Sequence, residues 1–161
     1  MNDAKSKIKN KIGIISDTHN LLRKEAVSAL QDADLIIHAG DIGDLQIIDK
    51  LKAISPVVAV RGNMDNELRA YDLKRTEVVD TGGHTIYVLH DLGRLDIRPS
   101  SSDIRVIVQG HTHRPAIYEH EGVLYINPGS AGPRRFKLPV TVALLDIEGK
   151  KLSAEIIDLK V

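Results

Sequence analysis

The chain has 161 residues, of which 42% are hydrophobic and 27% are charged, a composition typical of one ordinary globular domain. Lys plus Arg and Asp plus Glu each total 22, so the chain lacks the basic excess with which proteins bind nucleic-acid phosphates. Aromatic residues make up only 3%, which leaves few platforms for stacking single-stranded bases. The absence of cysteine excludes a disulfide scaffold, a thiolate zinc site and a cysteine nucleophile.

The ends of the sequence carry no targeting or membrane signal. No apolar run reaches the length of a membrane span, and the start lacks the hydrophobic stretch of a signal peptide. We therefore expect a cytoplasmic protein without a membrane partner. Residues 1–10 are polar and lysine-rich, which predicts a flexible N-terminal tail, and residues 11–161 are expected to form a single domain.

Strands and helices alternate in the first 60 residues. A helix is expected after Asn20, whose side chain can cap it, and a second helix over about residues 45–54, capped by Asp44. Short, nearly continuous apolar strands are expected at residues 12–16, 35–40 and 57–60. Such strands, separated by helices, predict a parallel sheet covered on both faces. His38 lies inside one of them and is expected to be a hydrogen-bonded core residue or a support for a site.

The pattern changes after residue 66, where short strands follow one another across tight turns. This half is expected to be strand-rich and largely antiparallel. Segment 91–102 contains a proline and three serines, so we expect no regular helix there beyond its first turn. The fold class predicted for the whole is α/β, a four-layer α-β-β-α sandwich with two mixed central sheets. The strands of this half are expected at residues 76–80, 84–90, 104–110, 116–120, 123–129, 140–147 and 151–159.

Polar groups with metal-binding chemistry follow the apolar strands. In open α/β sheets, ligands bind outside the carboxyl ends of the strands, so these groups are expected to meet. Each motif alone has a plain reading, because aspartate, asparagine and histidine are common in turns. All of them occur in sequence, each at the end of an apolar segment, which favours a metal site. The candidate residues are Asp17, His19, Asp41, Asn63, His90, His111 and His113.

These motifs resemble a known family. SDTH (16–19), GD (40–41), GN (62–63), the histidine at position 90 and GHTH (110–113), with INPGS (126–130), look like the calcineurin-like metallophosphoesterases. The similarity runs from about Lys11 to the end of the chain and is greatest to the small bacterial and archaeal phosphodiesterases, which are related in fold to the retromer scaffold subunit. It implies the metallo-dependent phosphatase-like fold.

The resemblance also implies a site for two metal ions bridged by Asp41. One ion would be held by Asp17, His19, Asp41 and His113, and the other by Asp41, Asn63, His90 and His111. Paired ions clamp a phosphate, and a hydroxide between them becomes the nucleophile, so no protein nucleophile is needed. Nitrogen and oxygen donors without sulfur suit manganese, which the resemblance favours, with iron, zinc, nickel and cobalt as alternatives.

The expected function is metal-dependent hydrolysis of a small phosphodiester or nucleotide-like substrate. The alternatives are a non-catalytic metal-binding scaffold on the same fold and a phosphomonoesterase. Met64 disfavours the monoesterase, because larger relatives carry there a histidine that helps the leaving group depart, and methionine cannot donate a useful proton. Asp91 stands after His90 where the family usually has glycine, so this loop is expected to differ. The sequence leaves the oligomeric state open, a homo-oligomer included.

Overall fold

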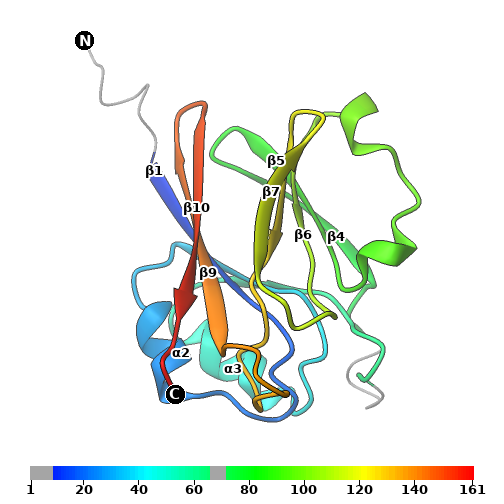
Figure 1. Cartoon of the computed structure of the whole chain (residues 1–161). Helices are drawn as coiled ribbons and strands as arrows, with labels where there is room; N and C mark the ends of the chain where they lie inside the picture. Colours follow the sequence, from blue (N-terminus) through cyan, green and yellow to red (C-terminus); the bar gives the residue numbers. More distant parts are fainter. Residues whose placement is uncertain (1–8, 66–71) are drawn as a thin grey trace.

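Two five-stranded sheets form the centre of the molecule (Figure 1). The structure is a computed structural model that describes residues 9–65 and 72–161, so most of the expected N-terminal tail (residues 1–8) lies outside the described residues. The first sheet has the strand order β10-β9-β1-β2-β3, with β1 Lys9–Ile15, β2 Leu35–His38, β3 Val57–Ala59, β9 Thr141–Glu148 and β10 Lys151–Asp158. The second has the order β4-β5-β6-β8-β7, with β4 Thr76–Thr81, β5 His84–Leu89, β6 Ile104–Val108, β7 Ala116–His120 and β8 Val123–Asn127.

The strand pairing is mixed in both sheets. Strands β1, β2 and β3 are parallel, as predicted, whereas β9 and β10 add antiparallel neighbours at one edge. In the second sheet, the β4–β5 and β7–β8 pairs are antiparallel, but β5, β6 and β8 run parallel to one another. The prediction of largely antiparallel pairing therefore holds for the hairpins and for β9 against β1, and it is wrong for β5, β6 and β8. Segment 91–102 carries the chain back across the sheet, which is the crossover connection that parallel neighbours require.

Two helices, α2 (Lys24–Ala29) and α3 (Gln46–Lys52), pack on the outer face of the first sheet (Figure 1). The expected cap by Asn20 was wrong. Asn20 adopts a left-handed φ of 73°, and the N-cap of α2 is Arg23, because the intervening residues belong to the loop that follows β1. Asp44 does act near the start of α3, where its Oδ1 accepts the Gln46 N–H at 2.9 Å.

Three buried clusters separate the layers. Alternating side chains of each strand point to opposite faces, so Ile15 packs against the helices while Ile12 and Ile14 pack between the sheets. The third cluster, which includes Tyr87 and Ile107, lies on the outer face of the second sheet. Two short 3-10 helices, η2 (Leu92–Arg94) and η3 (Pro99–Ser101), stand in segment 91–102 by that face. The four-layer fold class is confirmed, with its last layer reduced to these turns.

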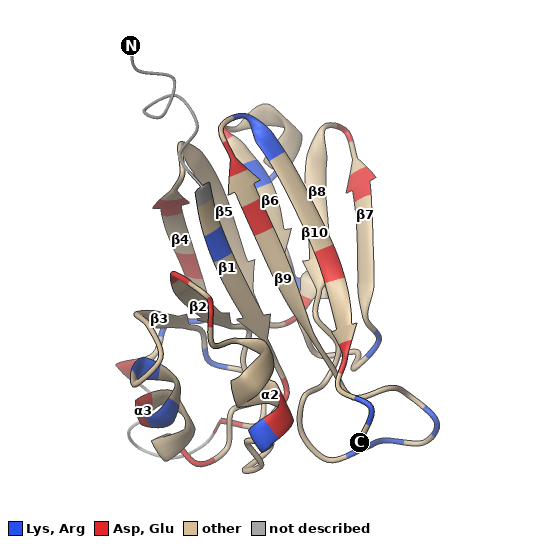
Figure 2. Ribbon diagram, turned by 90° about the vertical axis from the view of Figure 1, so that its left-hand side faces the viewer, with Lys and Arg blue, Asp and Glu red and all other residues tan. Residues whose placement is uncertain are grey.

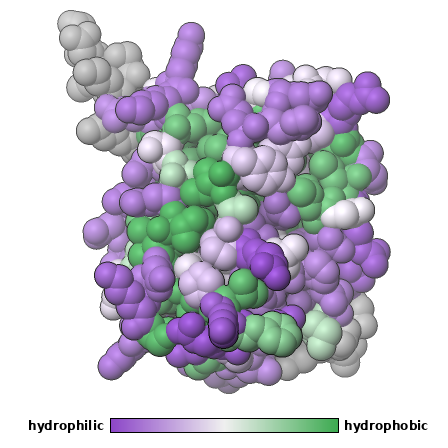
Figure 3. Space-filling model, viewed as in Figure 1, coloured by the Kyte–Doolittle hydropathy of each residue, from purple (hydrophilic) through white to green (hydrophobic). Residues whose placement is uncertain are grey.

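The surface carries charges of both signs interspersed along the strands and helices (Figure 2). In the view of Figure 3, hydrophobic side chains reach the surface between β10 and β7, where partly buried residues of the inter-sheet cluster lie. Within residues 9–65 and 72–161, every helix is too short or too polar to span a lipid bilayer.

Candidate metal centre

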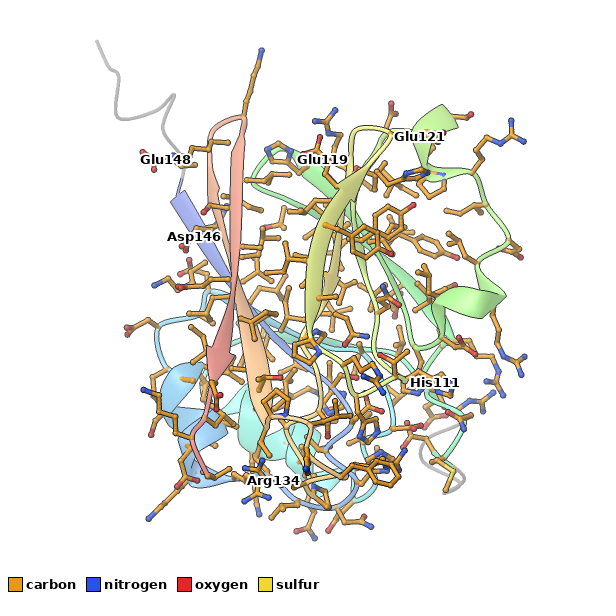
Figure 4. The ribbon with its side chains drawn as sticks, in the orientation of Figure 1. His111, Glu119, Glu121, Arg134, Asp146 and Glu148 are labelled. Atoms are coloured by element: carbon orange, nitrogen blue, oxygen red, sulfur yellow. The ribbon has the colours of Figure 1, made fainter. Side chains whose placement is uncertain are left out.

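The polar residues that follow the strands meet at one end of the two sheets. Asp17 follows β1, Asp41 follows β2 and His90 follows β5, and all three side chains are buried. Figure 4 shows His111 toward the end of the molecule where α2 and α3 lie, away from Glu119, Glu121 and Glu148 at the hairpins of the opposite end. The strand ends therefore bring distant parts of the sequence to one place, as the sequence predicted.

Asp17, His19 and His113 form the first group of candidate ligands. Oδ1 of Asp17 lies 3.6 Å from Nε2 of His19 and 3.4 Å from Nε2 of His113. The two imidazole nitrogens are themselves 3.3 Å apart. One donor atom from each residue thus lies within 4.8 Å of the other two, which is the spacing of atoms that share one cation.

Asp17, Asp41 and His90 form the second group, and their donor atoms also lie within 4.8 Å of one another. Nε2 of His90 is 3.2 Å from Oδ2 of Asp41 and 3.9 Å from Oδ1 of Asp17. Nδ1 of His90 donates to the carbonyl oxygen of Ala39 at 2.7 Å, which fixes the ring and turns the Nε2 lone pair toward the carboxylates. Asp17 belongs to both groups, so it joins Asp41 as a candidate bridge.

His111 and Asn63 lie at the rim of the same site. The His111 side chain is partly exposed, and its ring centroid is 5.2 Å from that of His90. Asn63 is exposed and lines a cleft together with these two histidines. The structure therefore brings five of the seven expected residues into two tight groups and leaves His111 and Asn63 on the open side. The assignment of all seven residues as metal ligands stays a prediction.

Several buried oxygen and nitrogen atoms that could bind a metal have no hydrogen-bond partner within the described residues. They include Oδ1 of Asp17 and Nε2 of His90, which face each other across the site. A buried polar atom without a partner costs about 1–3 kcal/mol, so such atoms are normally satisfied. Two carboxylates and neutral imidazoles around one space are the donor set that first-row divalent metals take. The residues therefore fit metal ions.

The charges of the site favour ionised carboxylates. Burial alone raises the pKa of Asp17, but the contacts with His113 and His19 outweigh it and hold that pKa far below its ordinary value. Burial likewise raises the pKa of Asp41, and its contact with His90 reverses this to a net lowering. The contact with Asp17 raises the pKa of His19. Two buried negative charges thus draw positive charge into the site, whether a proton on imidazole or a cation.

Five expected ligands have left-handed backbone conformations. Such residues cost about 1 kcal/mol or more each outside glycine, and they persist where surrounding structure holds them for function. The loops are held by backbone bonds such as Asp17 N–H to Gly40 O and His19 N–H to Asp41 O, at 3.0 and 3.1 Å. Strain on this many polar residues in one place supports a functional site. The φ values are 55° at Asp17, 43° at His19, 56° at Asp41, 73° at His111 and 64° at His113.

Glycines precede three of the expected ligands, and at two of these glycines, Gly62 and Gly110, the loops touch. A Cβ on Gly62 would lie 2.1 Å from Oδ1 of Asp41, and a Cβ on Gly110 would lie 2.1 Å from Oγ of Ser16. No side chain fits at either position, so the Gly-Asn and Gly-His pairs allow the loops after β3 and β6 to approach the aspartates closely.

The sequence did not single out Asp65, which organises two of the ligand loops. Its buried carboxylate accepts four backbone N–H groups: Asp41 and Gly62 on Oδ2, at 3.0 and 2.9 Å, and Ile42 and Gly43 on Oδ1, at 2.9 and 3.1 Å. These bonds join the loop after β2 to the loop after β3. The signal that could have found it is its place in the same RGNMD segment as Asn63.

His38 supports the site from the core, as expected. The hydroxyl of Thr18 donates to the carbonyl of Ile42, so it must accept a hydrogen bond from Nε2 of His38 at 3.1 Å. Nδ1 of His38 in turn accepts the Gly40 N–H at 3.1 Å. Both ring nitrogens of this neutral imidazole are therefore occupied within the protein, and burial lowers the pKa of His38 to about 3.

A family model that describes the calcineurin-like phosphoesterase superfamily domain matches residues 11–150. The chain belongs to the calcineurin-like phosphoesterase superfamily. A probable metallophosphoesterase of Methanothermobacter thermautotrophicus is 34% identical to this chain, and the alignment covers 91% of each protein. A phosphodiesterase of Methanocaldococcus jannaschii is 30% identical, over 88% of this chain and 95% of its own length.

The solved structure of Vps29 from Chaetomium thermophilum has the same fold as this calcineurin-like chain. The TM-score is 0.76 over 92% of this chain and 97% of Vps29, at 22% sequence identity. This likeness concerns the fold alone.

Proposed function

We propose that the protein hydrolyses phosphodiesters with two divalent metal ions, manganese in preference to iron, zinc, nickel or cobalt. The observation that carries the proposal is the pair of donor groups that share Asp17, with unpaired buried donor atoms facing one another. The similarity to the M. jannaschii phosphodiesterase supports the diester as substrate. The products would be a phosphate monoester and an alcohol.

The ions would be held by the expected ligands, Asp41 between them, and when bound they supply Lewis-acid activation of water and neutralisation of phosphate charge. The residues of the chain set the geometry. Asp41 Oδ1 accepts the backbone N–H of Met64 at 2.9 Å, which leaves Oδ2 directed at His90. His90 is oriented by Ala39, and Asp17 by Ser16, whose hydroxyl donates to Oδ2 at 2.6 Å.

The same arrangement leaves the departing alcohol without a dedicated proton donor at position 64. The Met64 side chain is 59% exposed beside the loop of Asp41 and carries no acidic proton. Good leaving groups, such as aryl alcohols of low pKa, depart readily without general-acid help. Aryl diesters are therefore the expected laboratory substrates.

The test is hydrolysis by metal-stripped protein to which single divalent ions are returned. Bis-p-nitrophenyl phosphate and p-nitrophenyl phosphate share a leaving group and differ in being a diester and a monoester. We expect turnover only with metal, highest with Mn²⁺, and a larger kcat/KM for the diester. Turnover of the monoester alone would support the phosphomonoesterase instead.

If neither substrate is hydrolysed with any of the ions, although the ions bind, the result would favour the non-catalytic metal-binding scaffold. Asp17→Asn supplies the matched check, because Asp17 takes part in both donor groups. The variant is expected to lose metal and activity together. Activity that persists in this variant at the level of the wild type would contradict the proposed site.

A further inference from the structure

A cleft of about 510 Å³ opens beside the candidate metal centre. His90, His111 and Asn63 line it on the side of the metal centre, and the side chains of Arg61, Arg75 and Arg94 line it as well. A substrate phosphate that lay against the histidines would extend the rest of its molecule toward these arginines. The cleft is therefore the space in which the part of such a substrate beyond the reacting phosphate would lie.

The backbone holds the arginines in place from three separate segments. The N–H of Arg61 donates to the carbonyl of Lys74 at 2.8 Å, which joins the loop after β3 to the residues just before β4 and Arg75. Thr76 pairs with Leu89, the residue before His90, so the start of β4 lies next to the metal side. Asp91 caps the turn of Arg94 by accepting the Gly93 N–H at 2.9 Å.

The described lining of the cleft carries charges of both signs. Arg75 and Arg94 line it together with two aspartates, Asp91 and Asp96. Arg94 lies 3.8 Å from Asp91, in a loose exposed pair that contributes little to stability. Arg75 is exposed, and no carboxylate in the described part of the chain lies within salt-bridge distance of it. Guanidinium groups bind phosphate oxygens in a planar, two-bond geometry, which makes this cleft suited to a second anionic group.

We propose, on the basis of the proposed function, that the substrate is a phosphodiester carrying a second phosphate, which Arg75 and Arg94 bind in this cleft. The scissile phosphate would lie at the metal centre, and the second phosphate would lie on the organic group that extends along the cleft. A carboxylate in the same position is also an anion, but it carries less negative charge than a phosphate monoester and lacks the third oxygen, so the two groups can be distinguished by experiment.

The experiment compares three p-nitrophenyl diesters. They are thymidine 5′-(p-nitrophenyl phosphate), which is the parent, and its derivatives with a 3′-phosphate or a 3′-succinate. All three release p-nitrophenol, so they differ only in the substituent at the 3′ position, which is a hydroxyl, a phosphate or a succinate. With the Mn²⁺-loaded wild type, kcat/KM for the 3′-phosphate is expected to exceed that of the parent about tenfold, the value of one good charge-assisted hydrogen bond. A succinate that matches the phosphate would show that any anion suffices and would overturn the phosphate assignment.

Variants assign the effect to the arginines. Arg75→Gln and Arg94→Gln should each lower the 3′-phosphate to parent ratio about threefold, and together they should bring it close to one. Arg98→Gln is the matched control, because Arg98 lies in the same segment but does not line the cleft. The ratio should remain at the wild-type value in this control. A double variant that keeps the full ratio would overturn the proposal.

Binding separates this inference from the proposed function. Calorimetry with the metal-loaded protein compares thymidine 3′,5′-bisphosphate with thymidine 5′-monophosphate, neither of which requires turnover. Tighter binding of the bisphosphate, lost in the double variant, would support the cleft even if no ester were hydrolysed. Equal binding of the two nucleotides, with normal hydrolysis of bis-p-nitrophenyl phosphate, would overturn the cleft and leave the phosphodiesterase standing.

Discussion

The carboxylate of Asp65 accepts the backbone N–H of Asp41 at 3.0 Å, although 24 residues separate them in the sequence. Each oxygen of this carboxylate accepts two N–H groups, so an amide in its place would keep one pair and turn its own NH₂ against the other. The two loops that carry Asp41 and Asn63 therefore depend on a full carboxylate at position 65.

Asp65→Asn is expected to destabilise the protein and to weaken its metal binding. Buried N–H groups left without an acceptor should lower the free energy of unfolding by about 3 kcal/mol. Misplaced ligand loops should weaken Mn²⁺ binding about 10–100-fold, the usual effect of losing a residue that orients ligands. Urea unfolding and calorimetric titration measure the two effects. Asp34→Asn is the control, because Asp34 accepts a single N–H, from Lys11, in an exposed position. Equal, small effects in both variants would show that Asp65 does not organise the site.

Asp41→Asn should abolish most of the activity, whereas Asp44→Asn should not. Asp41 lies in a donor group with Asp17 and His90, while the side chain of Asp44 accepts the N–H of Gln46 at the start of α3. Asparagine serves as well as aspartate near a helix N-terminus, so the second change should cost little stability. We expect kcat/KM to fall at least about 100-fold in Asp41→Asn, together with a loss of bound metal. Neither change is expected in Asp44→Asn. Similar losses in both, with metal retained, would mean that the wrong aspartate is assigned.

His38 should make the metal-free protein less stable in acid. Burial lowers the pKa of His38 from 6.5 to about 3, so between these values the unfolded chain binds a proton that the folded chain does not. The contribution of neutral His38 to the free energy of unfolding is complete above pH 6.5. It is lost as the pH falls toward 3, at up to about 1.4 kcal/mol per pH unit.

His38→Asn keeps an acceptor near the Gly40 N–H but removes the titrating ring. Urea unfolding between pH 4.5 and 7 should therefore depend less steeply on pH in this variant than in the wild type. His120→Asn is the control, because the His120 side chain is 66% exposed on the outside of the hairpin of β7 and β8. An unchanged slope in His38→Asn would mean that His38 does not stay neutral in the fold.

Met64 should make the rate depend steeply on the leaving group. Without a proton donor at this exposed position, the charge on the departing oxygen grows with the pKa of the alcohol, and general-acid help of about 10²–10⁴-fold is missing. Met64→His should flatten the plot of log(kcat/KM) against leaving-group pKa for a series of aryl and alkyl diesters. A shallow plot in the wild type, with chemistry rate-limiting, would indicate another donor, and Asp91 in the neighbouring cleft would be the first residue to substitute.

The sequence predicted the strands and the ligand loops well because their signals are local. An apolar run followed by a polar residue, as at Ile15 and Asp17, reports both the strand and its end. The hydrogen bonds of Asp65 leave no local signal, because its partners at Asp41 and Gly43 are brought near only by the pairing of β2 with β3. The late start of α2 has a similar cause. The loop around Asn20 is fixed by contact with Ile42, which overrides the capping preference of asparagine.

The parallel pairing of β5, β6 and β8 was missed for a different reason. Tight turns in this half predict hairpins, and hairpins did form at Gly82 and Gly122. Sheet neighbours that are not adjacent in sequence are decided by burial of the inter-sheet cluster, in which Val88, Val106 and Ile126 pack together. The sequence pattern within one strand does not indicate which other strands will pack beside it.

The most direct measurement of the central claim is an activity titration of metal-stripped protein with Mn²⁺. The rate of bis-p-nitrophenyl phosphate hydrolysis is recorded against the ratio of metal to protein, at protein concentrations well above the dissociation constant. Two bound ions that act together predict a negligible rate without metal and a break at about two ions per chain, reversed by chelator. A rate that is complete at one ion per chain, or one that survives removal of all metal, would contradict the two-metal phosphodiesterase.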